Sequence, residues 1–561
     1  MMELGDVVAI ENKGVTPQPG DVYRYVGLED IEQQTGRILN AQDTDGRDIQ
    51  SLKYVFSPSH ILYGKLRPNL NKVALPTFSG ICSTDILPLA PRGAVLREFV
   101  AYYLRTPRFV HYAVQHASGT KMPRFGPRQL LKASLPVPPL PVQERVVQIL
   151  QKADEIRRKR VEALELADMT LLALFLEMFG DPAANPKGWP RAELGELIND
   201  WQNGFATGNK DVEGGIPQVR MQNITTHGWF DKTLVRTVTR HRNHGRYLLQ
   251  EGDVLFNNTN SPELVGKTAL FREQGEWYLS NHISRVRPAR PITGEFLWGL
   301  LVLLWVRGTF RSMCRQWVNQ ASISREELLK IQVPVPSESL LRYHKDAVQQ
   351  LEAVREKLLH DESQATATYE SLLSRAFACE LTAEWEAANA EWIAAQQALH
   401  ERLPRLLLLA LLSEKAKRTA RAAAEILVTA LMKYAFLLQM EGSGRRRLYH
   451  FVPYHYGPFT KELYTDLQAL QEEGLVRVEN DSEEDKTKIT LVDPAKANEA
   501  LDALPDDLKE DAATIIETYG ALDHNALLKT VYEKYPAYAK KSRLRPARGA
   551  SRPPKSRGRR G

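Results

Sequence analysis

Apolar residues recur at alternating steps of three and four in two long stretches, one after residue 140 and one after residue 338. This heptad spacing is typical of a coiled-coil seam, so each stretch predicts a long helix. The seam positions are Val146, Ile149, Ala153, Ile156, Ala163 and Ala167 in the first stretch, and Val348, Leu351, Leu358, Ala365, Tyr369 and Leu372 in the second. Polar residues interrupt the seams at Arg160, Arg355 and Glu362. We expect the two helices to pair, because matching stripes bury each other; the alternative is that each helix packs on its own domain.

A short strand that ends in prolines precedes each predicted helix. The first junction reads "LPVPPLPVQERVVQIL" (135–150) and the second "KIQVPVPSESLLRYHKDAVQQL" (330–351). A residue before proline is held extended, so each junction ends a strand before the helix begins. Upstream, short β-rich pieces alternate with turn signals, and a helical stretch follows. Both halves therefore predict a mixed α/β domain.

The landmarks of the first half return in the same order in the second half. The "PVP" at 136–138 recurs at 334–336, "KVAL" at 72–75 answers "KTAL" at 267–270, and "ELGDVVAIENKG" at 3–14 answers "ELGELINDWQNG" at 193–204. Such an internal repeat predicts two copies of one domain. The expected segments are domains at 1–140 and 187–337, helices at 141–182 and 338–380, a helical linker at 381–404, a C-terminal domain at 405–539 and a tail at 540–561.

The composition is typical of a folded protein without a disulfide framework. Hydrophobic residues make up 43% and charged residues 25% of the chain. The three cysteines (Cys82, Cys314 and Cys379) lack metal-ligand spacing, which favours a reducing cytoplasm. The most apolar runs, at 296–306 and 403–412, are too short to span a bilayer and predict buried helices. We therefore expect a cytoplasmic protein with no membrane partner.

The net charge of +6 comes from the end of the chain. Residues 540–561 hold ten Lys and Arg and no acidic residue, so residues 1–539 carry −4 (6 − 10). The Pro, Gly and Arg content of this tail predicts disorder. It is interpreted as a non-specific polycation or as a cloning or frameshift remnant, and the alternative is that it grips phosphates. Nucleic-acid binding by the folded part must come from local patches.

The sequence contains no motif that predicts bond-making chemistry. The stretch "SPELVGKT" (261–268) resembles a phosphate-binding loop, but serine and proline stand where such a loop needs glycine. The Asn/Asp-Pro-Pro-aromatic stretch of adenine methyltransferases and the zinc motif HExxH are both missing. The pairs His241/His244 and His450/His455 lack further ligands at metal spacing and are expected to be surface histidines. We expect no catalytic residue, and no cofactor or metal bound by this chain.

Three stretches resemble the specificity subunit of type I restriction-modification systems. They are "GKLRPNLNKVAL", "SGTKMPRFGPRQLLKASLPVPPLPVQERVVQIL" and "NPKGWPRAELGEL", and the resemblance covers residues 1–380. It implies that each repeat is a target recognition domain for one half of a split DNA site, and that the two helices form an antiparallel coiled coil between them. It also implies three partners: double-stranded DNA, two adenine methyltransferase subunits and a translocating restriction subunit. The methyltransferase subunits would use S-adenosylmethionine, and the restriction subunit would use ATP and Mg.

Polar loop residues are the candidates for reading DNA, because Arg, Lys, Asn and Gln side chains recognise base edges when phosphate contacts position their platform. The loops differ between the repeats although the frames match, which predicts two different half-sites. The DNA-binding candidates are Lys65, Arg67, Asn69, Lys72, Lys121, Arg124 and Arg128 in the first repeat, and Gln222, Asn223, Asn257, Asn258, Asn260, Lys267, Ser322 and Ser324 in the second.

The chain extends beyond the part that the resemblance covers. A helical stretch, "AAAEILVTALMKYAFLLQMEG", precedes "HFVPYHYGPFTKELYTDLQALQEEGLVRVE" and "KTKITLVD". The order helix, turn, helix and two-stranded wing resembles a winged-helix unit and, loosely, antitoxin-like domains. Tyr456, Gly457 and Pro458 are expected to form the turn. The acidic run "ENDSEEDKTK" in the expected wing favours protein docking over DNA binding.

Two alternatives to a DNA-specificity subunit stay open at this stage. In the first, the protein is a regulator whose winged-helix-like part binds DNA. In the second, it is an antitoxin-like interaction protein without sequence preference. The expected fold is mixed α/β, with two tandem domains, two paired long helices and a mainly α-helical C-terminal domain.

Overall fold

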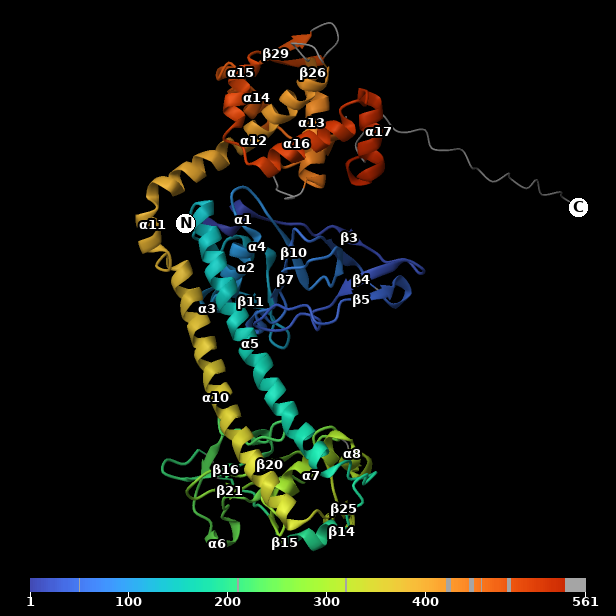
Figure 1. Ribbon diagram of the computed structural model, residues 1–561, viewed down its shortest axis with the longest axis vertical. Coiled ribbons are helices and arrows are strands. Elements are labelled where there is room, and N and C mark those ends of the chain that lie inside the picture. Colours follow the sequence, from blue (N-terminus) through green and yellow to red (C-terminus); the bar gives the residue numbers. More distant parts are fainter. Residues whose placement is uncertain are drawn as a thin grey trace, which may run out of the picture. The chain divides into compact units, whose positions relative to one another are not determined.

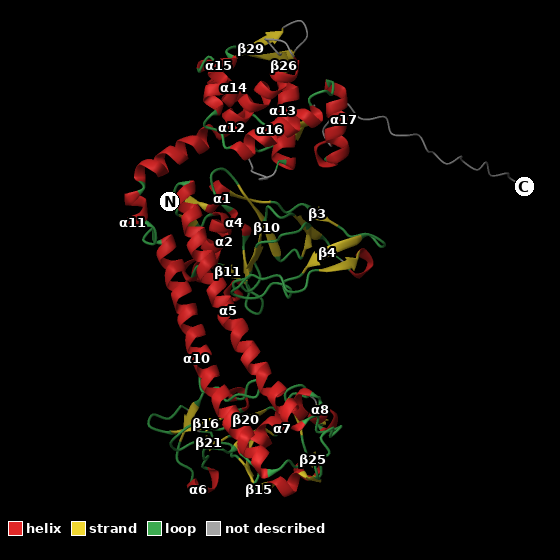
Figure 2. Ribbon diagram, in the orientation of Figure 1, coloured by secondary structure: helices red, strands yellow, loops and turns green. Residues whose placement is uncertain are grey.

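The computed structural model describes residues 1–49, 51–208, 211–317, 320–419, 425–442, 448–455, 457–481 and 486–539 (Figures 1 and 2). The chain divides into two compact units, Ala153–Tyr369 and the combination of Met1–Lys152 with the chain from Glu370 onward. The expected tail at 540–561, the residue Tyr456 and the centre of the acidic run (482–485) lie outside the described residues.

The first repeat is built on two sheets. A four-stranded sheet has the order β2-β10-β7-β8, and a five-stranded sheet has the order β3-β6-β9-β4-β5. Its elements are β1 (Met2–Glu3), α1 (Leu4–Val7), β2 (Val8–Ile10), β3 (Gly14–Val15), β4 (Val22–Val26), β5 (Gln42–Asp45), β6 (Lys53–Phe56), β7 (Ile61–Gly64), η2 (Pro68–Leu70), β8 (Val73–Ala74), β9 (Gly80–Cys82), β10 (Ile86–Pro91), α2 (Arg97–Arg105), α3 (Pro107–Gln115), β11 (Ala117–Ser118), β12 (Arg124–Phe125), α4 (Pro127–Leu131) and β13 (Ser134–Leu135).

The second repeat has the same frame. Its four-stranded sheet has the order β15-β22-β18-β20, and a three-stranded sheet, β17-β16-β21, stands in place of the five-stranded one. Its elements are β14 (Arg191–Glu193), η3 (Leu194–Leu197), β15 (Ile198–Asn203), β16 (Ile216–Val219), η4 (Met221–Asn223), β17 (Arg236–Val238), α6 (His244–Tyr247), β18 (Val254–Asn257), β19 (Thr259–Asn260), β20 (Thr268–Leu270), β21 (Tyr278–Leu279), β22 (Ile283–Pro288), α7 (Gly294–Val306), α8 (Thr309–Met313), β23 (Arg315–Trp317), β24 (Gln320–Ser322), α9 (Arg325–Leu329) and β25 (Gln332–Pro334).

The two "ELG" stretches begin their repeats in the same way. In each, the residue before the short helix has its backbone N–H capped by an acidic side chain three residues later, Glu3 by Asp6 at 3.1 Å and Glu193 by Glu196 at 2.9 Å. The glycine leaves room for a neighbouring turn, because a Cβ at Gly195 would lie 3.3 Å from the Leu329 carbonyl oxygen. The duplicated sequence therefore encodes a duplicated fold, which confirms the expected mixed α/β class with tandem domains.

The apolar run at 296–306 forms α7, which is buried in the core of the second repeat. Phe296, Leu300 and Leu301 have no exposed surface. No helix among the described residues has both the length and the apolar content that crossing a bilayer requires.

The two predicted long helices are α5 (Leu140–Phe179) and α10 (Glu338–Phe377). Contacts within the unit Ala153–Tyr369 define their relative direction there. Arg157 lies over the Tyr369 ring, Arg160 pairs with Asp361, and Asp168 pairs with Arg355, so the partner number falls as the α5 number rises. The helices are therefore antiparallel, as the resemblance implied (Figure 1).

The seam of the helix pair differs from the predicted stripe at Ile156. This side chain is 45% exposed, whereas Asp154 and Asp168 are buried at 8% and 7%. Arginines accompany both acids: Arg157 bonds to Asp154 at 2.7 Å and Arg355 to Asp168 at 2.6 Å. The apolar pattern alone predicts that Ile156 lies in the seam. The prediction is wrong at this residue because the paired charges at Asp154 and Asp168 occupy buried positions instead.

The helix pair also enters the core of the second repeat. Phe175 and Phe179 of α5 pack in one cluster with α7, together with Leu341 and Val348 of α10. A Cβ at Gly299 would lie 2.7 Å from the Phe175 ring, so the glycine allows α5 to approach α7 closely. The second domain is therefore built around the ends of the helix pair.

The C-terminal domain is mainly helical, as expected. Its elements are α11 (Ala383–Ala388), α12 (Ala390–Thr419), β26 (Glu425–Leu427), α13 (Val428–Glu441), β27 (Val452–Tyr454), β28 (Gly457–Phe459), α14 (Glu462–Glu472), β29 (Val476–Asp481), β30 (Lys486–Leu491), α15 (Pro494–Leu501), α16 (Asp506–Tyr519) and α17 (His524–Lys534). Because α12 runs through Pro404, no element ends at the expected boundary between 404 and 405.

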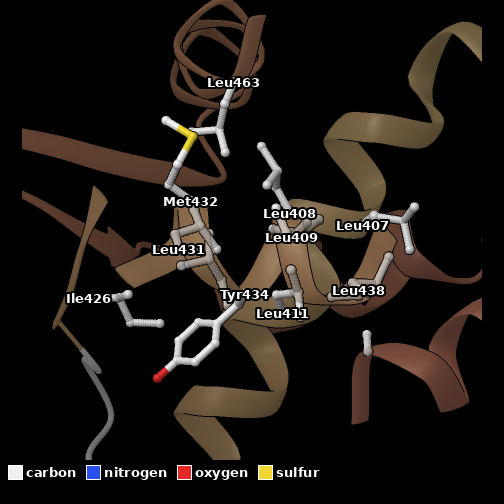
Figure 3. Packing of buried hydrophobic residues seen from close by; sticks show 14 of the residues in the cluster. Leu407, Leu408, Leu409, Leu411, Ile426, Leu431, Met432, Tyr434, Leu438 and Leu463 are labelled. Atoms are coloured by element: carbon white, nitrogen blue, oxygen red, sulfur yellow. The ribbon is translucent and has the colours of Figure 1, made fainter. Parts of the chain in front are cut away.

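The core of this domain joins α12 and α13. Figure 3 shows Leu408 and Leu411 of α12 gathered with Leu431 and Leu438 of α13, and these leucines are buried. The run at 403–412 is thus a buried part of α12, as predicted. Strands β29 and β30 pair antiparallel where the wing was expected, and β26 adds a third strand to their sheet.

Candidate nucleic-acid interface

In the first repeat the two candidate loops meet. The Arg67 backbone N–H donates to the Pro123 carbonyl at 2.8 Å, and the Phe125 N–H donates to the Lys65 carbonyl at 2.8 Å. A β-bridge joins Leu66 to Arg124. Lys65 and Arg67 therefore lie on backbone that is paired directly with the backbone of Arg124, although Arg124 is far from them in the sequence.

Asp85, just before β10, organises these cations. Its carboxylate accepts hydrogen bonds from Arg124 Nε at 2.9 Å and Arg124 Nη2 at 3.1 Å, and Lys65 Nζ lies 3.9 Å away. The bonds from Arg124 hold the pKa of this carboxyl below its usual range and raise the pKa of the Arg124 guanidinium. Asp85 is therefore ionised at neutral pH and fixes one edge of the arginine.

The remaining candidates of the first repeat lie at different depths. Asn69, Lys121 and Arg128 are exposed, on η2, before β12 and on α4 respectively. Lys72 is half-buried, and its ammonium donates to the Leu28 carbonyl at 2.6 Å. We infer that Lys72 secures a loop, whereas the other three present their side chains to solvent.

In the second repeat the equivalent backbone positions are defined by the same hydrogen bonds. Asn258 N–H donates to the His282 carbonyl at 3.0 Å, as Lys65 N–H donates to the Asp85 carbonyl at 2.9 Å. Ile323 N–H donates to the Asn258 carbonyl at 3.3 Å, as Phe125 does to Lys65. Strand β19 pairs with β24, so Thr259 lies opposite Ser322.

These bonds bring Asn258, Asn260 and Ser322 together as a neutral counterpart of the cationic loops. The Asn258 amide donates to Ser284 Oγ at 2.9 Å and accepts from Thr259 Oγ1 at 2.8 Å, and Asn260 Oδ1 accepts the Ser261 N–H at 2.9 Å. All three candidates are half-buried. At these matched positions the second repeat carries amide and hydroxyl groups where the first carries positive charge, and Arg315 stands opposite Ser322 on the neighbouring strand β23.

Three candidates of the second repeat belong to its interior. Asn223 and Asn257 have no exposed surface, and Lys267 is 7% exposed. The Asn223 amide donates to the Asp231 carbonyl at 2.9 Å, and Lys267 Nζ donates to the carbonyls of Met221 and Ile224. Burial lowers the pKa of Lys267. The side chains of Asn223 and Lys267 hold loops, and all three side chains are buried.

Gln222 and Ser324 lie on two other segments of the second repeat, and Ser324 directly follows Ile323, whose N–H donates to the Asn258 carbonyl. Gln222 is exposed on η4, and Ser324 is the half-buried N-cap residue of α9. The loop of Gln222 is the one that Lys267 secures, just as Lys72 secures the loop at Leu28 in the first repeat. The repeats thus share the way in which they hold this loop.

Sequence reasoning missed Asp85 and its counterpart His282. Neither lies in a loop rich in basic or amide residues, and 39 residues separate Asp85 from Arg124. The signal was the internal alignment, because Asp85 and His282 each stand one residue before matching strands, β10 (Ile86–Pro91) and β22 (Ile283–Pro288).

The histidine pair of the second repeat forms polar contacts within the protein. His244 Nδ1 lies 2.5 Å from the Tyr278 hydroxyl, and His244 Nε2 lies 2.9 Å from Glu276. Within the described part of the chain, no group of three or more His, Cys, Asp and Glu side chains is arranged to hold a metal ion.

The comparisons with known proteins agree with the resemblance in the sequence. The type I restriction enzyme EcoDI specificity subunit of Escherichia coli is 29% identical over 203 residues, which cover 35% of this chain and 44% of that protein. The EcoKI specificity subunit of Escherichia coli strain K12 is 21% identical over 345 residues, which cover 57% of this chain and 72% of that protein. The chain thus spans less than half the length of the first relative. No family model matches.

Among solved structures, one described as the basis of complex assembly and conformational transition of the type I R-M system is similar over 67% of this chain and 96% of its own, with 21% identity and a TM-score of 0.42. The named relatives confirm that this chain is similar to type I specificity subunits.

Proposed function

We propose that this chain is the DNA-recognition subunit of a type I restriction-modification complex and reads a bipartite site. Each repeat reads one half-site through its paired loops. The antiparallel helices α5 and α10 connect the two reading domains and set the number of base pairs between the half-sites. The chain itself makes and breaks no covalent bond.

The observation that carries this proposal is that the two repeats share a backbone arrangement but carry different side chains on the paired loops. The same backbone hydrogen bonds position Lys65 and Arg124 in the first repeat and Asn258 and Ser322 in the second. DNA sequence is read by side chains held on a rigid platform, and different side chains select different bases.

The partners follow from the similarity to type I specificity subunits. The chain is proposed to bind double-stranded DNA, two adenine methyltransferase subunits and a restriction subunit that translocates DNA. S-adenosylmethionine would be bound by the methyltransferase subunits, and ATP and Mg by the restriction subunit. In this proposal the recognition chain determines where on the DNA the complex binds, and its partner subunits carry out the reactions there.

Selection from a randomised duplex library tests this function. The full chain, purified with its methyltransferase subunits, is incubated with duplexes of random sequence, and the bound molecules are sequenced. We expect two fixed blocks separated by a spacer of constant length and free sequence. A single block, or a bound pool without sequence preference, would contradict the proposal.

A further inference from the structure

The geometry points to Arg124, held by Asp85, as a reader of guanine in the half-site of the first repeat. This inference rests on the proposed function and adds the base and the atoms that read it. The structurally equivalent position of the second repeat is Ser322, which lacks a cationic fork. Arg315 stands opposite Ser322 in the register of β23 and β24, but its guanidinium is bonded to Glu327 at 2.9 Å.

The way in which Asp85 binds Arg124 leaves the reading edge of the arginine available. Guanidinium has five N–H donors, and Asp85 accepts from Nε and from one N–H of Nη2. The N–H groups at the outer end, on Nη1 and Nη2, are then left to point away from the carboxylate. Two parallel N–H groups match guanine O6 and N7 in the major groove, which is the commonest specific contact between arginine and a base.

The surroundings of Arg124 suit a DNA contact. Its side chain is 47% exposed, and the backbone around it is fixed by the bridge to Leu66 and by the bond from Phe125 to Lys65. Exposed Arg67 and Arg128 lie on the neighbouring segments and supply positive charge for phosphates. A long flexible side chain is thereby held in one direction before DNA arrives, which lowers the entropy lost on binding.

Asp85 is a positioning residue in this arrangement. Its carboxylate is 23% exposed, and its lowered pKa keeps it charged at neutral pH. A carboxylate at a DNA-facing loop repels phosphate, so its presence there is accounted for by its two bonds to Arg124. Without the carboxylate, the arginine would sample other rotamers and would contact bases and phosphates alike.

The test maps methylated adenines in genomic DNA from cells that carry the full chain as wild type, Arg124→Lys or Arg124→Gln. Arg124→Lys retains the charge and removes the fork, so any effect of charge alone is controlled. Arg128→Gln removes an exposed cation of the same surface and serves as the matched control. Binding is then measured on duplexes in which each base pair of the wild-type motif is changed in turn.

We expect both Arg124 variants to relax one G·C position in one half-site, with a loss of about 5- to 150-fold in discrimination against the other bases. The other half-site should stay unchanged. Asp85→Asn should relax the same position to a smaller extent. Arg128→Gln should weaken binding to all duplexes equally, without relaxing any position.

The inference is overturned if Arg124→Gln retains full discrimination, or if the position that the variants relax is not a G·C pair. Thermal unfolding of each purified variant identifies one that fails to fold, and Asp85→Asn then decides by the same criterion of base and position. Failure of the proposed function looks different, because the wild-type chain itself would then direct no bipartite methylation.

Discussion

His344 of α10 is buried without a hydrogen-bond partner among the described residues. It has no exposed surface, and its ring lies 4.9 Å from the Phe179 ring and 5.9 Å from the Phe175 ring, measured between centroids. Burial lowers its pKa to about 4, because an apolar environment disfavours the imidazolium. A histidine in such a place makes the second repeat sensitive to acid.

Stability should fall as the pH falls, because the unfolded chain binds the proton more readily than the folded chain. The unfolded chain takes up the proton near pH 6.5 and the folded chain only near pH 4, so stability is present above pH 6.5 and is lost as the pH falls towards 4. We expect the free energy of unfolding to fall by about 2 kcal/mol between pH 7.5 and pH 5 through this residue. His344→Leu should remove that component, measured as the difference between denaturant midpoints at the two pH values.

The matched control for this prediction is His360→Leu, at an exposed position of the same helix. It should retain the pH dependence of the wild type. Equal pH dependence in His344→Leu and in the wild type would show that the buried imidazole is not its source.

A buried ion pair and an exposed one cross the same helix pair. Arg355 and Asp168 lie 2.6 Å apart with side chains 15% and 7% exposed, and the guanidinium lies 4.2 Å from the centroid of the Trp229 ring. Arg160 and Asp361 lie 3.3 Å apart, and their side chains are 45% and 26% exposed. Their different burial should make their contributions to stability very different.

Arg355→Met should lower the free energy of unfolding by about 3 kcal/mol, because it removes the bonded guanidinium from the buried Asp168 carboxylate and leaves only the His227 imidazole, 3.8 Å away, beside it. Arg160→Met should change it by less than about 1 kcal/mol. Denaturant unfolding followed by tryptophan fluorescence measures both, since Trp229 lies beside Arg355. Similar losses in the two variants would argue against burial as the cause.

At the scale of elements, Lys267 and Lys72 hold equivalent loops of the two repeats. Lys267→Met should lower the stability of the second repeat by about 1–3 kcal/mol, because the carbonyls of Met221 and Ile224 lose a buried donor. The methylated motif of the folded variant should stay unchanged. Lys232→Met, which removes an exposed partner of Glu273, is the control for loss of charge. A changed motif with unchanged stability would place Lys267 among the DNA contacts.

The elements themselves were largely predictable. The prolines at 136–138 and 334–336 placed the ends of two strands, and the helices begin at Leu140 and Glu338, close to the expected starts. The Lys72 and Lys267 alignment found equivalent positions, but not their depth, because a sequence does not tell which loop a long side chain reaches. Asp85 was not predicted for a related reason, because it contacts Arg124 only in the folded chain.

At the scale of the whole molecule, the chain contains two repeats, a pair of long helices and a C-terminal domain. The two repeats share a backbone arrangement and differ in the side chains of their paired loops, so each serves as a reference for the other. The expectation that the C-terminal domain docks a protein partner stays a prediction. Its strands β29 and β30 form the expected hairpin, and exposed Glu479 lies on it.

The central claim is that this chain selects a bipartite DNA site for methylation. Single-molecule sequencing of genomic adenine methylation, with the gene intact, deleted and restored, tests it most directly. We predict that one bipartite motif loses its methylation on deletion and regains it when the full chain is restored. An unchanged methylation map after deletion, with the methyltransferase subunit expressed, would contradict the account.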